Sequence, residues 1–188
     1  VEDTEAAIAS AEAGFKAWRA TAAFTRADAI HRIADEMSRR TDEGARMIST
    51  ETGKPIAQAQ REWALSVDQF RWYAEEARRI TGQIIESRAP GGRLEVHHEP
   101  VGVVAAFTAW NFPAVLIARK VAPALAAGCS IIVRPSRETP GTASVLIDCL
   151  VQAGVPEGVV SLVVGPTSTT YDVLMKSPVV RKVSLTGS

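Results

Sequence analysis

The chain has 188 residues, of which 46% are hydrophobic and 22% charged, and its 21 basic and 21 acidic side chains cancel to a net charge of zero. This composition is typical of a globular protein with a buried core, and it excludes a disordered chain, which needs low hydrophobicity and a large net charge. Without an overall basic excess, neither nucleic acid nor an anionic membrane is expected as a partner.

The cysteines and the apolar runs indicate in which cellular compartment the protein is expected. Two cysteines, Cys129 and Cys149, are too few for a disulfide scaffold, and their spacing fits no zinc motif. Arg119 and Lys120 interrupt the longest apolar stretch, well short of the ~20 residues of a membrane span. The acidic N-terminal segment is unlike a signal peptide. We therefore expect a cytoplasmic protein with no metal site and no membrane partner.

Residues 1–82 contain most of the charge and have a helical pattern. Thr25 and Asp28 stand at capping-box spacing ahead of an apolar stripe, which predicts a helix start there. Gly53, followed by Pro55, indicates that one helix stops and another begins. Between the apolar positions of that second helix lie charged residues, expected to form a solvated face. They are Arg61, Glu62, Arg71, Glu75, Glu76, Arg78 and Arg79.

Residues 83–100 predict a β-hairpin. Two β-favouring stretches, 83–86 and 93–98, flank the turn-forming sequence Pro90-Gly91-Gly92.

From Val101 onward, apolar runs alternate with helical segments. The runs predict strands at 101–106, 129–133, 159–164 and 182–185, with helices between them at 113–127, 140–153 and 167–177. This alternation predicts an α/β fold, a Rossmann-like parallel sheet with helices on both faces. Ligands bind such sheets beyond the carboxyl ends of the strands, so the residues after each run are candidate site residues.

Glycines, hydroxyls, arginines and an amide occupy those positions. Gly165 and Gly187, each within two residues of a hydroxyl residue, suit either a phosphate at a helix start or a helix cap without a ligand. Arg134 and Arg137 flank a serine, a set that suits a phosphate but also fits ordinary surface arginines. Asn111 could donate to a developing oxyanion, or it could simply cap the helix that follows.

Five motifs in this order resemble the NAD(P)-dependent aldehyde dehydrogenases. They are FTAWNFP at 107–113, PALAAGC at 123–129, VRPSRETP at 133–140, AGVPEG at 153–158 and VSLTGS at 183–188. The resemblance runs collinearly over at least residues 96–188, and the N-terminal helices and hairpin agree with the family layout.

The resemblance implies aldehyde oxidation through a covalent thiohemiacetal. A Cys thiolate attacks the aldehyde, hydride passes to the nicotinamide, and water activated by a Glu cleaves the thioester. Asn111 matches the asparagine whose amide holds the oxyanion. The family carries its Cys and Glu downstream of the position of Ser188, so Cys129 and Cys149 are expected to be structural and these 188 residues alone to be inactive.

Several residues match the cofactor site of the family. Thr108 and Trp110 match residues that line the cofactor cleft, and Gly165 matches the glycine of the dinucleotide turn. Gly187 and Ser188 match the Gly-Ser pair at the helix over which the pyrophosphate lies.

Three positions depart from the family pattern. Ala109 replaces a proline, Arg134 replaces the lysine that bonds the adenosine ribose, and Arg137 replaces a frequent glutamate that binds ribose hydroxyls. Because a carboxylate there would repel a 2′-phosphate, whereas Arg134, Ser136 and Arg137 could bind one, we predict a preference for NADP, with NAD possible.

The sequence Ile117-Ala118-Arg119-Lys120 is most similar to the succinate-semialdehyde dehydrogenase branch. That similarity makes Arg119 the candidate anchor for a distal carboxylate and predicts an ω-semialdehyde acid, such as succinate semialdehyde, as the substrate. The alternative for Arg119 is an ion pair on the helix surface.

The predicted organisation has three parts: N-terminal helices of the cofactor-binding domain at 1–82, an oligomerisation hairpin at 83–100, and a Rossmann-like cofactor-binding half at 101–188. The full-length protein is expected to form a homodimer or homotetramer. The alternative to an enzyme is a non-catalytic nucleotide-binding or interaction module. A parallel sheet that ended after its fourth strand would leave an edge uncovered, which favours the enzyme.

Overall fold

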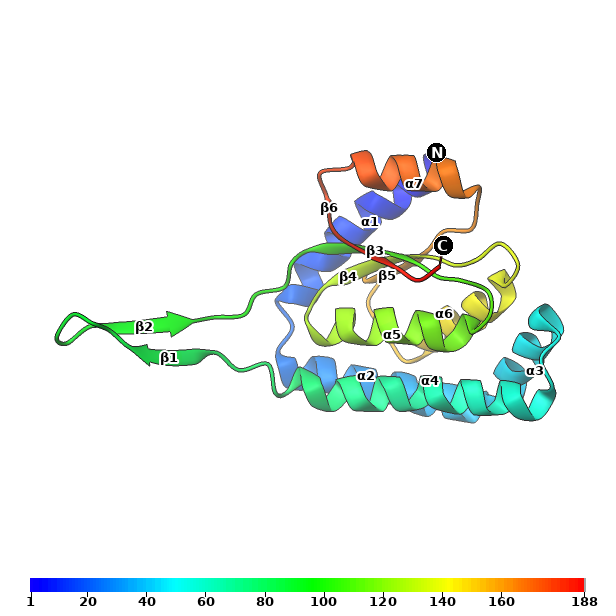
Figure 1. Ribbon diagram of the computed structural model, residues 1–188, viewed down its shortest axis with the longest axis horizontal. Helices are drawn as coiled ribbons and strands as arrows, with labels where there is room; N and C mark the ends of the chain where they lie inside the picture. The colour runs from blue at the N-terminus through cyan, green and yellow to red at the C-terminus, as the bar shows by residue number, and fades with distance from the viewer. Residues whose placement is uncertain (188) are drawn as a thin grey trace.

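A computed structural model describes residues 1–187 and confirms the α/β fold (Figure 1). A four-stranded parallel sheet carries helices on both faces, and a two-stranded antiparallel hairpin projects from one end. The helices before the hairpin are α1 (Glu2–Arg19), α2 (Ala23–Arg39), α3 (Thr41–Thr52) and α4 (Ile56–Ala77). The hairpin consists of β1 (Gln83–Glu86) and β2 (Arg93–Val96).

The second half of the chain alternates strictly between strand and helix, as its apolar runs predict. Its elements are β3 (Val103–Phe107), α5 (Pro113–Ala126), β4 (Ser130–Arg134), α6 (Pro140–Gln152), β5 (Val160–Leu162), α7 (Thr167–Lys176) and β6 (Val180–Leu185). All seven predicted elements are present, with ends displaced by a few residues at most.

The strand order β5-β4-β3-β6 creates a reversal beside β3. The chain first builds outward from β3 to β4 and β5, and α7 then brings it back to place β6 on the opposite side of β3. Phe107 pairs with Arg134 on one side and Leu185 on the other, so the carboxyl ends of β3, β4 and β6 coincide. Such a reversal point is where open α/β sheets bind ligands.

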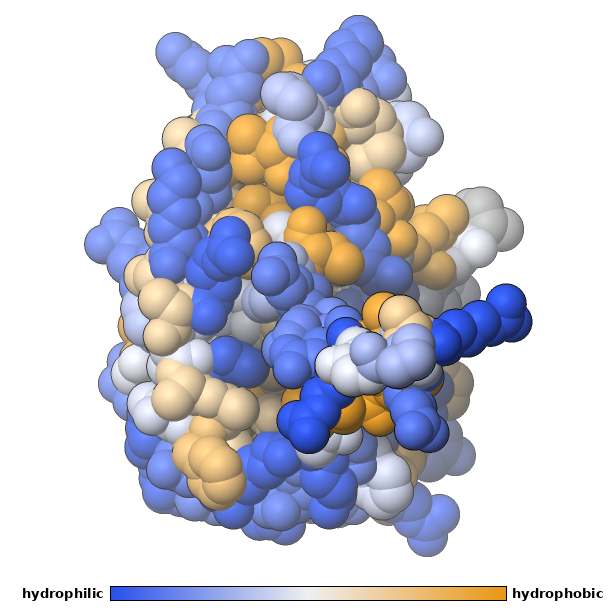
Figure 2. Space-filling view, turned by 90° about the vertical axis from the view of Figure 1, so that its left-hand side faces the viewer, coloured by the Kyte–Doolittle hydropathy of each residue, from blue (hydrophilic) through white to orange (hydrophobic). Residues whose placement is uncertain are grey.

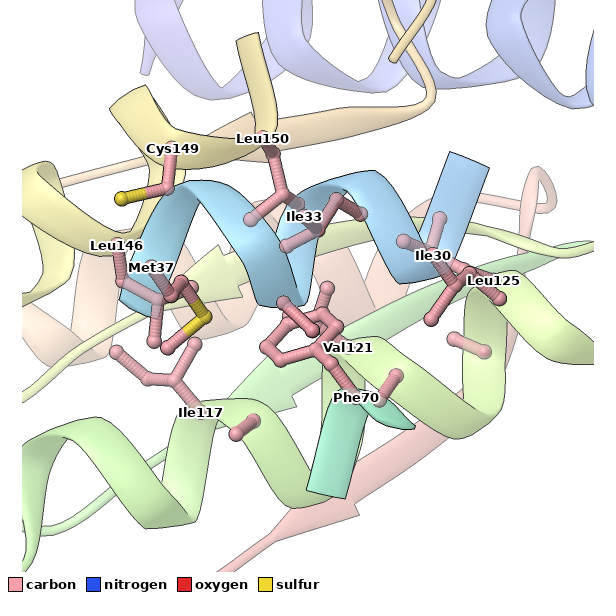
Figure 3. Close-up of a cluster of buried hydrophobic side chains, with 14 of the residues drawn as sticks. Ile30, Ile33, Met37, Phe70, Ile117, Val121, Leu125, Leu146, Cys149 and Leu150 are labelled. Atoms are coloured by element: carbon pink, nitrogen blue, oxygen red, sulfur yellow. The ribbon is translucent and has the colours of Figure 1, made fainter. Parts of the chain in front are cut away.

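The two central strands, β3 and β4, are buried on both faces, which explains their continuous apolar runs, whereas β5 is partly buried and β6 is largely exposed. In β3, Val104 and Ala106 face the larger core beneath α5 and α6, whereas Val103, Ala105 and Phe107 face α1 and α7. The larger core extends through a second helical layer: side chains of α2 and α4 meet those of α5 and α6 (Figure 3).

Two buried tryptophans connect helices through their indole N–H groups, Trp63 within the layer of α2 and α4 and Trp18 between α1 and α5. Trp63 donates to the carbonyl oxygen of Met37 at 2.8 Å, and Trp18 donates to that of Leu125 at 2.9 Å. Each satisfies its polar atom within an apolar environment, as a buried indole requires.

The helix boundaries confirm one signal and correct another. Gly53 ends α3 in the left-handed conformation at φ 70°, and Pro55 precedes α4, as predicted. The capping box at Thr25 is wrong: α2 begins earlier, at Ala23, without a side-chain cap. Asp28 lies within the helix and accepts a hydrogen bond from Arg78 of α4 at 2.9 Å, so tertiary contact explains this carboxylate better than capping does.

The hairpin has no buried residue in either strand. Ile84 and Leu94 are among its exposed hydrophobic residues, at 75% and 54% exposure. Figure 2 views this end of the molecule, where hydrophobic residues show among hydrophilic ones. Among the described residues, no helix is both long and apolar enough to cross a bilayer.

Candidate active site

A cavity of about 640 Å³ lies at the carboxyl ends of β3, β4 and β6, beside the strand-order reversal. Backbone hydrogen bonds extend the strand register into its walls, from Thr186 N to the oxygen of Phe107 at 3.0 Å and from Thr108 N to the oxygen of Arg134 at 3.3 Å. The cavity is lined by Phe107, Thr108, Ala109, Trp110, Asn111, Arg134, Ser136, Thr167, Tyr171, Val183, Leu185, Thr186 and Gly187.

The structure therefore brings six predicted site residues to one cavity: Thr108, Trp110, Asn111, Arg134, Ser136 and Gly187. Arg137 is exposed and does not line it, and Gly165 lies just outside. Ser188 lies outside the described residues.

Two buried polar atoms of the cavity lining have no hydrogen-bond partner within residues 1–187. They are the hydroxyl oxygen of Thr108 and Nε of Arg134, in residues that are 7% and 6% exposed. Buried polar groups are nearly always paired with protein, water or a ligand, so these two atoms are available to water or to a ligand that enters the cavity.

Arg134 also secures the third strand-end turn. Its Nη2 donates to the carbonyl oxygen of Gly165 at 2.9 Å, which holds the turn between β5 and α7 against the end of β4. Burial lowers the pKa of this guanidinium, and the positive charge of Arg137 adds to the effect. Arg134 is therefore a fixed cation in the cavity wall, which excludes the ordinary surface arginine as its interpretation.

A carboxylate that the sequence analysis missed stands beside these arginines. The hydroxyl of Ser136 donates to the carboxylate of Glu138, and this hydrogen bond lowers the pKa of the Glu138 carboxyl, with Arg137 and Arg134 contributing. The local charge is thus less positive than two arginines and a serine suggested.

Gly187 provides a close backbone approach to the cavity. Its φ of 147° is a conformation that favours glycine, and a Cβ built there would meet nothing nearer than the Cβ of Ala109 at 4.0 Å. The space beside this backbone is therefore open to a ligand.

Asn111 belongs to an irregular segment, residues 108–112, which we call the Asn111 loop. The residue that caps α5 is Phe112, and no side chain in the capping position bonds to the helix. The simple helix-cap interpretation of Asn111 is thus wrong. Asn111 is exposed and lines the cavity, so its side-chain amide is accessible to a ligand there.

A glutamate predicted to be solvated closes the start of α5 instead. Glu62 of α4 is only 2% exposed, and its carboxylate accepts hydrogen bonds from Ala114 N at 2.9 Å and Val115 N at 3.5 Å. Its other oxygen pairs with Lys54. The prediction of a solvated face was wrong at Glu62 because α4 packs its side chain onto the free N–H groups of another helix.

The start of α6 is closed in the same way. Glu51 of α3 accepts hydrogen bonds from Gly141 N at 2.6 Å, from Thr142 N at 2.8 Å and from the Thr142 hydroxyl at 2.6 Å. Within residues 1–187, no side chain accepts a hydrogen bond from the first N–H groups of α7, which follows Pro166, and its Thr167 and Tyr171 line the cavity. Of these three helix starts, only that of α7 remains available to an anion.

Arg119 lies away from this cavity. It lines a second one of about 430 Å³, on the α5 side of β3 and β6, together with Lys120, Lys182 and Ser184. Its guanidinium makes no hydrogen bond or ion pair with any residue of 1–187, so the surface ion pair finds no support. Beside it, Lys120 Nζ donates to the Ser184 hydroxyl at 2.9 Å, and burial lowers the pKa of this amine.

Both cysteines are buried, Cys129 where β4 begins and Cys149 inside α6. Burial raises the pKa of the Cys149 thiol to about 11, the opposite of what a nucleophilic cysteine needs. No group of three or more His, Cys, Asp or Glu residues that could hold a metal occurs in the described part of the chain.

Known proteins that are similar to this chain identify its family. The sequence profile of the aldehyde dehydrogenase family matches residues 1–188. The chain is 44% identical over 186 residues to a succinate semialdehyde dehydrogenase of Acinetobacter baylyi, and 43% identical over 187 residues to the 4-(hydroxymethyl)benzenesulfonate dehydrogenase TsaD1 of Comamonas testosteroni.

A succinate-semialdehyde dehydrogenase from Burkholderia pseudomallei has a similar structure, with a TM-score of 0.98 and 42% identity over 100% of this chain. The chain covers only 38% to 39% of the length of these three proteins.

Proposed function

Because the chain belongs to the aldehyde dehydrogenase family, we propose that the full-length protein carrying it oxidises a small aldehyde to the carboxylic acid, with hydride transfer to NADP or NAD. The observation that carries this proposal is the cavity at the strand-order reversal, which gathers Asn111, Thr108 and Arg134 at the ends of adjoining strands. The Cys nucleophile and the Glu base of the family would lie outside residues 1–188.

In this proposal, Asn111 holds the oxyanion formed when the aldehyde carbonyl is attacked. A side-chain amide aimed at that oxygen contributes on the order of 10²–10³ in rate. Replacing Asn111 by Ala in the full-length protein should therefore lower kcat by about that factor. Cofactor affinity, measured by fluorescence titration, should stay within about twofold of the wild type. An unchanged kcat would contradict the role of Asn111.

The lining of the cavity fits a dinucleotide cofactor, which supplies the hydride acceptor when bound. The unpaired Thr108 hydroxyl and Arg134 Nε can bond to its polar groups, and the open backbone at Gly187 and the uncapped start of α7 suit its phosphates. Trp110 and Gly165 would line the same cleft, and so would Ser188, which the structure does not describe.

NADP is the preferred cofactor in this proposal. Replacing Glu138, which lies beside the predicted 2′-phosphate site, tests that preference. Arg134, Ser136 and Arg137 would bind a 2′-phosphate, for which Ser136 would have to release the Glu138 carboxylate. Glu138→Gln should then raise kcat/KM for NADP relative to NAD, because it removes a like charge. A wild-type kcat/KM for NAD equal to or above that for NADP would sink the preference.

In this proposal the substrate is an ω-semialdehyde acid such as succinate semialdehyde, and it would have to reach from Asn111 at the first cavity to Arg119 at the second, with Arg119 binding its distal carboxylate. Two of the named relatives support an anionic substrate, since succinate semialdehyde and 4-(hydroxymethyl)benzenesulfonate both carry an anionic group away from the reacting carbon. Arg119→Ala should raise KM for succinate semialdehyde far more than for propanal. An equal rise for both aldehydes would refute the assignment.

The exposed hairpin within residues 83–100 serves a homodimer or homotetramer, and residues 1–82 and 101–188 build the cofactor-binding domain. Ile84→Lys in the hairpin should shift the sedimentation coefficient towards smaller species, whereas Val151→Lys, at another exposed hydrophobic position, on α6, should not. The two free, buried thiols suit a reducing compartment, so we place the protein in the cytoplasm. Its zero net charge favours no nucleic-acid or membrane partner.

A further inference from the structure

Lys54 connects the helical N-terminal layer directly to the Asn111 loop. It follows the left-handed turn at Gly53, between α3 and α4, and its side chain is only 12% exposed. Its Nζ donates to the backbone oxygen of Asn111 at 2.9 Å and lies 4.1 Å from the centre of the Phe112 ring. One ammonium group therefore contacts two consecutive residues of the loop.

Glu62 fixes that ammonium and the start of α5 at the same time. One carboxylate oxygen pairs with Lys54, and the other accepts the N–H groups of Ala114 and Val115. The loop is consequently held at two points, at the Asn111 carbonyl through Lys54 and at the first turn of α5 through Glu62.

Backbone hydrogen bonds also hold the two ends of the loop, from Thr108 N to the oxygen of Arg134 and from Leu116 N to the oxygen of Phe112, but the side chains between them are exposed. Trp110 and Phe112 are exposed at 54% and 47%, and Asn111 is exposed as well, so their side chains do not bury the loop. Rate contributions from a catalytic amide depend on placing it within a fraction of an ångström, and misplacement by about 1 Å can cost about 100-fold.

We propose that Lys54 and Glu62 are positioning residues for catalysis, because their buried ion pair sets where the Asn111 amide lies at the rim of the cavity. This inference rests on the proposed function, since it assigns a purpose to the placement of Asn111. A purely structural role would lower activity only as far as the amount of folded protein falls. A positioning role predicts that kcat falls further than that.

Glu51 provides a matched control. Like Glu62, it is a glutamate from the N-terminal helices that accepts two backbone N–H groups at the start of a helix of the sheet. Its hydrogen bonds go to Gly141 and Thr142 of α6 and to no residue of the Asn111 loop.

The test compares Lys54→Met with Glu51→Gln in the full-length protein. Lys54→Met keeps the length of the side chain and removes its charge and donors, so kcat should fall about 10- to 100-fold, with KM for the cofactor within about twofold of the wild type. Glu51→Gln should lower Tm by a few degrees and leave kcat within about twofold. Lys54→Arg, which keeps a cationic donor, should recover part of kcat.

Hydrogen exchange provides a second measurement that does not depend on turnover. In Lys54→Met, the backbone amides of Ala114 and Val115, which donate to the Glu62 partner of Lys54 where the loop meets α5, should exchange faster, while those of β3 and β4 keep their wild-type rates. The proposal is overturned if kcat of Lys54→Met matches that of Glu51→Gln, or if exchange at these two amides does not change. A wild-type protein without aldehyde dehydrogenase activity would instead refute the proposed function, and the exchange rates would still decide whether Lys54 anchors the loop.

Discussion

The starts of α5 and α6 are closed by glutamates, whereas the start of α7 is open. Glu62 and Glu51 reach across from the N-terminal helices to accept the free N–H groups of the first two. Among the residues that the structure describes, α7 has no such partner; it contributes Thr167 and Tyr171 to the cavity, where Tyr171 also packs on Phe107 with ring centres 6.0 Å apart.

This difference locates the part of the rim that can bind an anion. Each helix start presents partial positive charge and free donors, and a carboxylate that accepts those donors removes both from use by a ligand. Glu62 and Glu51 therefore occupy the N–H groups at the starts of α5 and α6, and of these three helix starts only that of α7 keeps such groups unused within residues 1–187. Three experiments can break or sharpen this contrast.

The largest effect on stability is expected at the start of α5, which Glu62 caps. Glu62→Ala leaves Lys54 without its buried partner and two N–H groups of α5 without an acceptor, so it should lower the free energy of unfolding by about 3–5 kcal/mol. Urea unfolding measures this change. Asp68→Ala, at an exposed position of the same helix, should stay within about 0.5 kcal/mol of the wild type. Similar losses in the two variants would mean that the carboxylate at the start of α5 is not structural.

A smaller effect on stability, with a larger one on cofactor affinity, is expected for Thr108 in the lining of the cavity. Thr108→Val removes a buried hydroxyl that has no partner within residues 1–187, so the unfolding free energy should change by less than about 1 kcal/mol. If the hydroxyl bonds to the cofactor, its loss should raise the Kd for NADP by about 2- to 10-fold, as measured by calorimetry. Thr108→Ser should retain affinity. A marked loss of stability in Thr108→Val would show that the hydroxyl has a structural partner.

The smallest effect concerns the buried thiol of Cys149 in α6, one of the two helices whose starts are capped by a glutamate. Burial raises the pKa of Cys149 to about 11, so the native thiol stays protonated, and iodoacetamide at pH 8 should leave it unlabelled. Because the folded pKa lies above the unfolded value, this group's contribution to stability is complete below pH 9 and is lost as the pH rises through 11. Mass spectrometry of the peptide that contains Cys149 detects labelling, and modification as fast as in urea would contradict the burial.

Local pattern predicted most of the second half of the chain. Buried parallel strands must be apolar on both faces, so runs such as 129–133 are visible without any partner. The cavity residues that follow those strands were predicted for the same reason, since parallel strands end at one rim. The helices of the first half were recognisable too, but the function of their charged residues was not.

The missed residues act at a distance along the chain. Glu62 contacts Ala114, 52 positions away, and Glu51 contacts Gly141, 90 positions away. In a helical pattern such glutamates look like any solvated carboxylate, because periodicity records which face is polar and carries no information about what that face packs against.

By itself, the sequence determined the alternation of strands and helices, the single rim on which Asn111, Arg134 and Gly187 gather, and the resemblance to the aldehyde dehydrogenases. Those features depend on local periodicity and on motifs of adjacent residues. Only the tertiary structure decided that Arg119 lies in a different cavity, that Arg134 holds the turn at Gly165, and that two helix starts are already closed. The physical reason is that hydrogen-bond partners and burial are set by the packing of distant segments, which no local pattern specifies.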